Sequence, residues 1–322
     1  MKISYVITVY NKAKYVADVI ESLRVENDGQ YEAVEYIFVD DGSTDNSIEV
    51  INQNKSLLAG DVKILEQENS GAAKATNMGV EAANYEWIRL LDGDDIVCKN
   101  STAIMYNAAQ REKVDFVIGS YSYFSRDKEL LPQIEIVDEN DYVVMTQEDC
   151  LKRFIKNFSH NSSCMLLSKS LFLAFSGADT RLMSPDYSMA LRAIAITDKI
   201  VRMRGNVTQM VDEAPGRLSS QIRRSRYDSV MAIYSLAFEL MPERRDVAKS
   251  VYRRACSRSY RYSRILKNNP GKHFTRYIWS KFYTPSDLKT ATYKCLTAYT
   301  FNGKSDRPSE WVPGYKASKA HN

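Results

Sequence analysis

The chain has 322 residues, of which 44% are hydrophobic and 26% charged, a balance typical of a globular protein and unlike a fibrous or disordered one. Its five scattered cysteines include no CxxC pair, so neither a zinc site nor a disulfide framework is indicated. The first residues lack the long apolar core of a signal peptide, and no apolar run approaches the roughly 18 residues of a membrane span. We therefore expect a cytoplasmic protein.

The first hundred residues alternate strand-like and helix-like patterns. Short apolar runs rich in β-branched residues predict buried strands, and apolar residues at helical spacing predict the helices between them. The predicted strands cover residues 3–9, 34–39, 62–65 and 87–91, and the predicted helices cover 14–23, 44–51 and 71–83. This alternation predicts an α/β fold with a mostly parallel sheet flanked by helices. Ligands of such sheets bind outside the carboxyl ends of the strands.

The pattern loosens after residue 100 and becomes helical after residue 217. Helices are predicted at 101–111, 146–154, 186–196, 229–240 and 244–266, and extended segments at 116–124 and 163–167. We expect two parts, a catalytic domain over residues 1–216 and a basic, mainly helical region over residues 217–322.

Charge divides the chain at the same place. Residues 1–216 contain 22 Lys and Arg against 33 Asp and Glu, whereas residues 217–281 contain 16 against 4. Basic residues interleaved with aromatic ones, as in the segment 273–283, suit an anionic membrane surface. No nucleic-acid motif accompanies them, so we favour peripheral contact with a membrane over RNA. A solvated helical face or an oligomer contact is the alternative, and the sequence leaves the oligomeric state open.

Three carboxylates follow the fourth predicted strand. Asp92 and Asp94 share a turn through Gly93, and Asp95 comes next. Carboxylates this close repel one another unless a cation lies among them, and oxygen ligands suit Mg²⁺ or Mn²⁺. Such an ion would bridge to a substrate diphosphate. The alternative is an acidic surface turn, or caps for the next helix.

Two further segments have polar residues at strand or helix ends. Asp41 ends the second strand without an obvious local partner, which favours a bond to a ribose or a base, whereas Thr44 or Asp45 is expected to cap the next helix. Gly71 begins a helix whose first residues are small. A bare helix N-terminus attracts phosphate, although close helix packing explains the same pattern.

The order of these motifs resembles that of the family 2 glycosyltransferases of GT-A fold, over about residues 1–200. The motifs are Thr8-Val9-Tyr10-Asn11, Val39-Asp40-Asp41-Gly42-Ser43-Thr44-Asp45, Asn69-Ser70-Gly71 and Leu91-Asp92-Gly93-Asp94-Asp95. The resemblance implies an inverting transferase that uses a nucleotide-diphosphate sugar and a divalent metal. It implies that the metal ligands are Asp92, Asp94 and Asp95. The residues implied to bind the nucleotide are Thr8, Tyr10, Asn11, Asp41, Gly71, Lys74, Asn77 and Asp92. Lys74 would supply the positive charge of an arginine that the family often has beside the residue matching Asn77.

The family also has an acidic general base downstream, usually a Glu-Asp pair before a helix. Here Asp186 matches the catalytic Asp, and Pro185 stands in place of the Glu. An inverting transferase needs one carboxylate to accept the proton of the acceptor hydroxyl. The alternative role for Asp186 is a helix N-cap. The histidine that the family often has some 25 residues later is missing from residues 211–219.

The resemblance implies transfer of a sugar to a hydroxyl of a glycan or glycolipid, in bacterial surface-polysaccharide or lipooligosaccharide biosynthesis. A sugar nucleotidyltransferase is disfavoured, because residues 10–14 contain no glycine for a phosphate-binding loop. A non-catalytic nucleotide-sugar-binding module of the same fold stays open.

Overall fold

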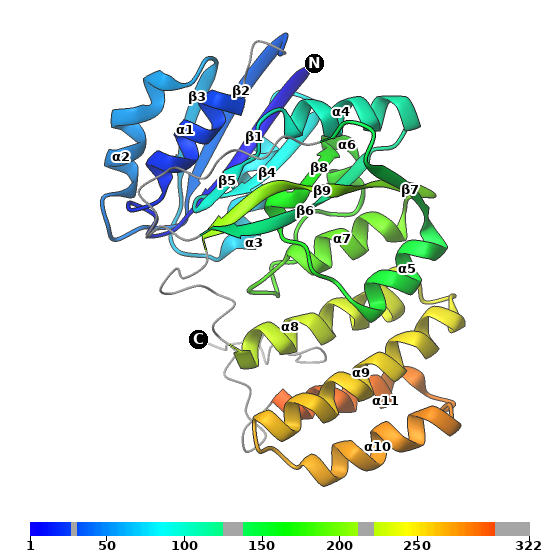
Figure 1. Cartoon of the computed structure of the whole chain (residues 1–322). Coiled ribbons are helices and arrows are strands. Elements are labelled where there is room, and N and C mark those ends of the chain that lie inside the picture. The colour runs from blue at the N-terminus through cyan, green and yellow to red at the C-terminus, as the bar shows by residue number, and fades with distance from the viewer. Residues whose placement is uncertain (27–30, 125–137, 212–221, 300–322) are drawn as a thin grey trace, which may run out of the picture. The chain divides into compact units, whose positions relative to one another are not determined.

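The computed structural model describes residues 1–26, 31–124, 138–211 and 222–299, which form two compact units (Figure 1). Among the described residues, the first unit comprises 1–26, 31–124, 138–150, 158–180 and 185–211, and the second comprises 151–157, 181–184 and 222–299. The predicted boundary after residue 216 lies outside the described residues, as do positions 212–219 of the segment without a histidine.

The described residues of the first unit form a nine-stranded sheet in the order β3-β2-β1-β4-β8-β6-β9-β5, with β7 paired to β9. The strands are β1 (Lys2–Val9), β2 (Ala33–Asp40), β3 (Asp61–Glu66), β4 (Trp87–Asp92), β5 (Asp95–Val97), β6 (Phe116–Phe124), β7 (Tyr142–Thr146), β8 (Met165–Ser168) and β9 (Lys199–Val211). The α/β fold is confirmed, but the sheet is mixed. Strands β1 to β4 are parallel, whereas β8 is antiparallel to β4 and β6, and β9 is antiparallel to β5 and β7.

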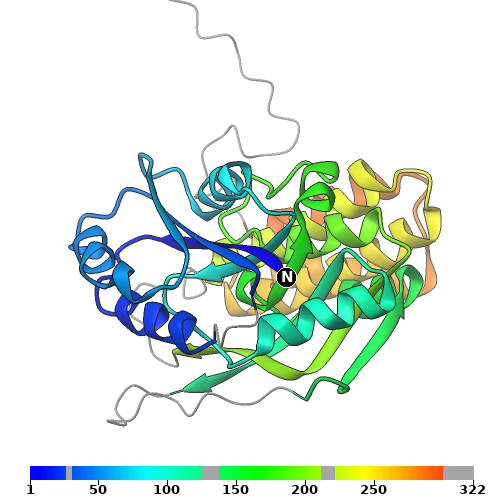
Figure 2. The same ribbon diagram turned by 90° about the horizontal axis from the view of Figure 1, so that it is seen from above.

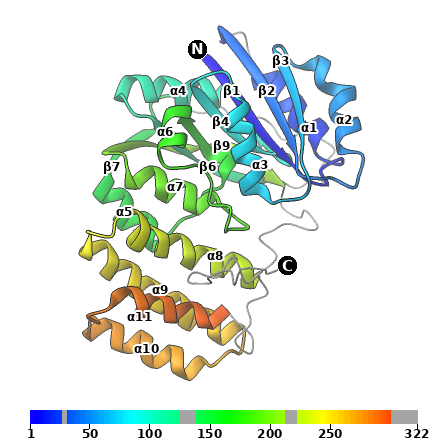
Figure 3. The same cartoon turned by 180° about the vertical axis from the view of Figure 1, so that it is seen from behind.

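Helices cover both faces of the parallel strands. The helices of residues 1–211 are α1 (Val16–Glu26), α2 (Ser47–Asn54), α3 (Ala72–Ala82), α4 (Ser101–Glu112), α5 (Gln147–Lys156), α6 (Lys169–Ala174) and α7 (Asp186–Ala195), of which α1 and α3 lie on the two faces of the parallel strands (Figure 2). Helix α1 lies in front of the strands in Figure 1, and α3 lies in front of them in the opposite view of Figure 3. Seen from above, these two helices lie on either side of β1 and β2 (Figure 2). Right-handed crossovers place α1 and α3 on opposite faces of the sheet. The chain moves outward from β1 to β3 and then returns to the other side of β1 for β4, so the direction of the crossover reverses.

The helix predicted from residue 44 begins later, at Ser47. Helix α2 begins at Ser47 with Asn46 as its N-cap residue, and the Asn46 side chain forms no capping hydrogen bond. Instead, Asp45 accepts a hydrogen bond from the backbone N–H of Ser47 at 3.0 Å. The polar run before this helix therefore forms a loop that extends from the end of β2.

The second unit is helical in its described residues. It contains α8 (Ile222–Ser235), a π-helical turn (Leu236–Leu240), α9 (Arg245–Ile265), α10 (Pro270–Phe282), α11 (Leu288–Tyr293) and a 3-10 helix (Lys294–Tyr299). Within the described ranges, no helix combines the length and apolar character needed to cross a membrane.

Candidate active site

The candidate site is at the carboxyl ends of β1, β2 and β4, which are neighbours in the sheet. Thr8 of β1 is in register with Asp92 of β4, and Val9 is in register with Asp40 of β2. Parallel strands end at one edge of a sheet, so motifs far apart in the chain meet there.

Asp92 is held from two sides. Its carboxylate accepts hydrogen bonds from the Ser162 hydroxyl at 2.9 Å and from the Thr8 hydroxyl at 3.3 Å. Its backbone N–H donates to Ser163 Oγ at 2.9 Å. Burial raises the pKa of Asp92, and the nearby charge of Asp94 raises it further. The two carboxylates thus repel each other in the absence of a bound cation.

The turn at Gly93 brings Asp94 beside Lys12. The backbone N–H of Gly93 donates to Thr8 O at 2.8 Å, and a Cβ at this position would lie 2.9 Å from that oxygen. Only glycine allows this close approach. Lys12 Nζ lies 2.5 Å from Asp94 Oδ2, and Asp94 is buried.

Asp95 points into the protein. It is 2% exposed, and one of its carboxylate oxygens accepts hydrogen bonds from Asn161 Nδ2 at 2.7 Å and Ser163 Oγ at 2.6 Å. Ser163 thereby connects Asp95 to the backbone of Asp92. This arrangement fixes the acidic turn against residues 161–163.

A buried arginine links the strands next to the acidic turn by hydrogen bonds. Arg89 of β4 is fully buried and donates to the carbonyl oxygens of Met165 and Val207 and to the hydroxyl of Thr208, at 3.2–3.3 Å. The hydroxyl of Thr208 in turn donates to Ser163 O at 2.7 Å. Strands β4, β8 and β9 are therefore tied together beneath the acidic turn.

Asp186 is the first residue of α7, whose N-cap residue is Pro185. The pKa of its carboxyl is raised to about 7, first by burial and then by the charge of Asp92, while hydrogen bonds with Ser162 oppose the rise. Ser162 therefore lies between Asp186 and Asp92, since it also donates to Asp92. A carboxyl with a pKa near neutrality suits a general base.

Asp179, the nearest alternative to Asp186, is differently placed. It is 6% exposed and forms an ion pair with Arg192 at 3.4 Å. A paired carboxylate is a weaker proton acceptor than an unpaired one, because the cation stabilises its charged form. The geometry therefore favours Asp186.

Several side chains predicted to bind the nucleotide form hydrogen bonds with other residues of the chain. The Asp41 carboxylate accepts from Gln67 Nε2 and from the backbone N–H groups of Ser70 and Gly71, at 2.7–2.9 Å. These partners of Asp41 are not local, because they belong to a loop distant in sequence that folds back onto it. Asn11 has a left-handed backbone, and its side chain accepts from Thr44 N at 2.8 Å.

The remaining residues predicted to bind the nucleotide have different surroundings. Asn77 bonds Ala178 in both directions, with its Nδ2 donating to the carbonyl and its Oδ1 accepting from the N–H. Gly71 is the N-cap residue of α3 with a φ of +92°, a conformation that favours glycine. Tyr10 and Lys74 are exposed at this edge of the sheet.

The sequence did not predict a role in this site for two serines, an asparagine and a lysine. Ser162, Ser163 and Asn161 organise the acidic turn, and Lys12 neutralises Asp94. The available signal was the polar run from His160 to Ser163 directly before the apolar strand β8. Lys12 lies three residues after the end of β1, and ligands of this fold bind near the carboxyl ends of such strands.

The residues present fit a divalent cation held by two carboxylates. Asp92 and Asp94 supply hard oxygen donors, and Mg²⁺ is commonly bound through one or two carboxylates together with substrate phosphates. Within the described residues, no group of three or more His, Cys, Asp or Glu side chains is arranged to hold a metal ion. The donor set therefore suits an ion that binds together with a diphosphate.

Comparison with known proteins identifies the family to which these motifs correspond. The sequence profile of Glycosyl transferase family 2 matches residues 4–173. Glycosyltransferase GlyG of Streptococcus pneumoniae is 31% identical over 251 residues, which cover 70% of this chain and 74% of GlyG. The poly(ribitol-phosphate) beta-glucosyltransferase of Bacillus spizizenii is 33% identical over 146 residues, covering 43% of this chain but 23% of that protein.

Solved structures show the same fold at low identity. Residues 1–349 of S. aureus TarS, in complex with UDP-GlcNAc, align with a TM-score of 0.61 at 16% identity, covering 97% of this chain and 82% of the other. The mannosyltransferase PcManGT of Pyrobaculum calidifontis, in complex with GDP-Man and Mn²⁺, aligns with a TM-score of 0.54 at 14% identity, covering 92% and 85%.

Proposed function

The chain belongs to glycosyl transferase family 2, and from this premise we propose that it transfers a sugar from a nucleotide-diphosphate donor to a hydroxyl of a glycan or glycolipid, with inversion at the anomeric carbon. Two named relatives, the poly(ribitol-phosphate) beta-glucosyltransferase and the minor teichoic acid biosynthesis protein GgaA, support bacterial surface-polymer biosynthesis as the setting. The action is cytoplasmic, with peripheral contact to an anionic membrane through the basic helices of the second unit.

One observation supports this reaction above all. Asp186, with a pKa of about 7, lies across Ser162 from Asp92 at the strand ends. In the proposed step, the acceptor oxygen attacks the anomeric carbon, and the bond from that carbon to the diphosphate oxygen breaks. The acceptor proton passes to Asp186, and the nucleoside diphosphate leaves with the bonding electrons. No covalent enzyme intermediate is required.

Asp92 and Asp94 would hold Mg²⁺ or Mn²⁺, which when bound would neutralise charge on the leaving diphosphate. We assign Asp95 a positioning role, because its carboxylate is buried against Ser163 and Asn161.

We propose two kinds of nucleotide-binding residue. Tyr10 and Lys74 are exposed and are proposed to contact the nucleotide directly, together with Thr8 and Gly71. Asp41, Asn11 and Asn77 are proposed to act by holding the loops that surround it, since their side chains bond to backbone groups.

A panel of nucleotide sugars with Mn²⁺ tests this proposal. Binding raises the melting temperature by mass action, so the true donor should stand out. Release of the nucleoside diphosphate, and its loss in Asp186→Asn, should follow for that donor. Binding without any turnover, in the presence of extracts that contain candidate acceptors, would instead favour a non-catalytic nucleotide-sugar-binding module.

A further inference from the structure

Helix α10 exposes a continuous apolar face. Phe274, Ile278 and Phe282 recur every four residues and fall within roughly 80° around the helix axis. Phe282 is 84% exposed and Trp279 beside this stripe is 62% exposed. The opposite face, at His273 and Ser280, is buried. Side chains of this size are rarely left in water on one helix without a partner.

Positive charge predominates in the two helices that form this region. From residue 245 to residue 283 the chain contains eleven Lys and Arg against one acidic residue, Asp246, which lies in the first turn of α9. Lys272 and Lys281 flank the apolar stripe of α10 on its two sides. Lysines in these positions extend their charged ends past an apolar surface into water or toward anionic groups.

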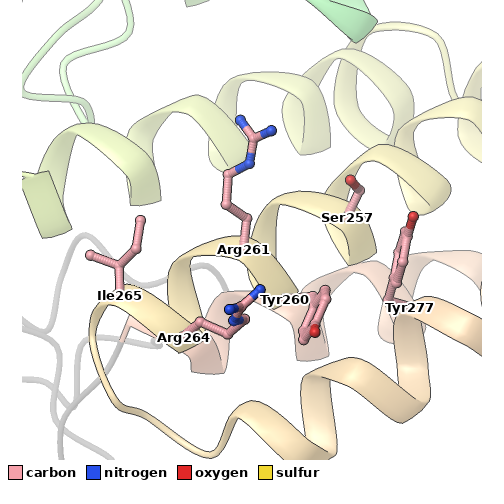
Figure 4. A pocket seen from close by; sticks show the side chains of 6 residues that line it. All are labelled: Ser257, Tyr260, Arg261, Arg264, Ile265 and Tyr277. Carbon is pink, nitrogen blue, oxygen red and sulfur yellow. The ribbon is translucent and has the colours of Figure 1, made fainter.

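A pocket opens beside these helices. It has a volume of about 500 Å³ and is lined by Ser257, Tyr260, Arg261, Arg264, Ile265 and Tyr277 (Figure 4). Tyr260 and Tyr277 stack with ring centroids 5.5 Å apart, and the Arg264 guanidinium lies 6.0 Å from the Tyr260 ring. Neither Arg261 nor Arg264 forms an ion pair with an acidic side chain of the described residues. Unpaired guanidinium groups at a pocket rim suit a phosphate ester.

We propose that α10 and the C-terminal half of α9 form a membrane-binding surface, in which the apolar side chains of α10 enter the lipid interface while Arg261 and Arg264 bind phosphates of anionic lipid headgroups. This inference specifies which residues make the membrane contact and which lipid group they bind, and it rests on the peripheral location proposed above.

The positive charge and the apolar side chains of this surface distinguish among the partners that could bind it. A second copy of the same face would bring two strongly basic surfaces together, which is unfavourable. RNA would pair with the arginines, but exposed aliphatic side chains such as Ile265 and Ile278 have no role in base stacking. An anionic bilayer accommodates both features, because apolar side chains enter below the headgroups while cations lie among the phosphates.

Vesicle flotation with the full chain tests the inference. The chain should float with vesicles of phosphatidylglycerol and phosphatidylcholine at low salt, and poorly with pure phosphatidylcholine or at high salt. The double variant Trp279→Ser/Phe282→Ser should bind anionic vesicles at least about tenfold more weakly. Leu173→Ser is the matched control, because Leu173 is 53% exposed on α6 of the other unit. These exposed positions leave the fold intact, as circular dichroism would verify.

The arginines are tested separately. Arg261→Gln/Arg264→Gln should weaken binding to anionic vesicles by a similar factor, whereas Lys152→Gln/Lys156→Gln, an equal loss of exposed charge on α5, should have little effect. In the unmodified chain, brominated lipids should quench tryptophan fluorescence, and Trp279→Phe should remove this quenching.

Several results would overturn the inference: no vesicle binding, equal binding to neutral vesicles, or equal binding by the surface variants. Self-association through this face, or binding of RNA in place of vesicles, would assign it to another partner. Transfer to a soluble acceptor does not depend on this surface, so failure here is distinguishable from failure of the proposed glycosyltransferase activity.

Discussion

The ammonium nitrogen of Lys12 lies 2.5 Å from a carboxylate oxygen of Asp94, where the sequence predicts a divalent cation. Their side chains are 23% and 8% exposed, so water screens this pair only in part. Lys12 also lowers the pKa of Asp92, against the effect of burial and of Asp94. One lysine thus offsets the repulsion between the two carboxylates while no divalent ion is bound.

Replacing Lys12 should strengthen metal binding. In Lys12→Met, Mn²⁺ no longer competes with an ammonium for Asp94, and its affinity should rise by about 3- to 10-fold, or about 0.7–1.4 kcal/mol. Titration with Mn²⁺ alone, followed by electron paramagnetic resonance, measures this. Lys14→Met is the control, because Lys14 is exposed on the same loop. Weaker Mn²⁺ binding in Lys12→Met would contradict the competition.

Asp94→Asn should remove the metal-dependent part of diphosphate binding, since a neutral amide is a poor ligand for a hard cation. Calorimetric titration with the nucleoside diphosphate, with and without EDTA, measures that part. The variant's affinity should match the wild-type affinity in EDTA. Asp61→Asn, at an exposed position on β3, should behave like the wild type. Equal wild-type affinities in the two buffers would remove the metal from the proposal.

Asp186→Asn should separate binding from chemistry. The amide keeps the shape of the side chain but cannot accept the acceptor proton, so transfer should fall by at least about 10²-fold. Donor affinity should change little, because Asp186 is proposed to face the acceptor. Both quantities are measured on one purified variant. Transfer at a near wild-type rate would end the assignment, and Asp179 would be tested next.

The parallel half of the sheet was predictable because its signals are local. Each of β1, β2 and β4 is an apolar run that ends at a polar motif, and these motifs mark the ligand edge. Strand β9 was not predicted, since Arg202, Arg204 and Asn206 interrupt its apolar residues. It is a strand because it pairs with β5, β6 and β7, which lie far away in sequence.

The same limit applies to the site. The acidic turn was visible in the sequence as a cluster of carboxylates. That Ser162 would lie between Asp92 and Asp186 was not, because it depends on how β8 docks beside β4. The partners of Asp41 were likewise hidden, since its carboxylate binds a loop that begins after β3.

Arg89 should matter for stability without touching substrate. Arg89→Met would leave the carbonyl oxygens of Met165 and Val207 without their buried donor, and should lower the free energy of unfolding by about 2–4 kcal/mol. Urea denaturation measures the loss. Arg24→Met is the control, with a side chain 47% exposed, and should change stability by no more than about 0.5 kcal/mol. Equal midpoints for the two variants would exclude this supporting role.

The pKa of Asp186 should respond in opposite directions to its two neighbours. Burial raises it most, the Asp92 charge raises it next, and hydrogen bonds with Ser162 lower it. Asp92→Asn removes a negative charge, so the charged form of Asp186 becomes easier to reach and its pKa should fall. Ser162→Ala removes the side-chain hydrogen bond that favours the charged form and keeps the backbone one, so the pKa should rise. Carboxyl-carbon NMR of the metal-free protein, with Asp186→Asn used to assign the signal, measures both changes.

The pH dependence of the transfer rate should follow the same changes in the pKa of Asp186. Asp186 must be deprotonated to act as the base, so kcat/KM should increase with pH up to the pKa of Asp186, which is about 7 without a bound cation, and then level off, with a loss of about tenfold per unit below that pKa. Ser162→Ala should move this acidic limb to higher pH. A bound divalent cation should move it to lower pH, because positive charge near Asp186 favours the carboxylate. An acidic limb at the same pH in the wild type and in Ser162→Ala, or no acidic limb in either, would show that Asp186 does not control the reaction.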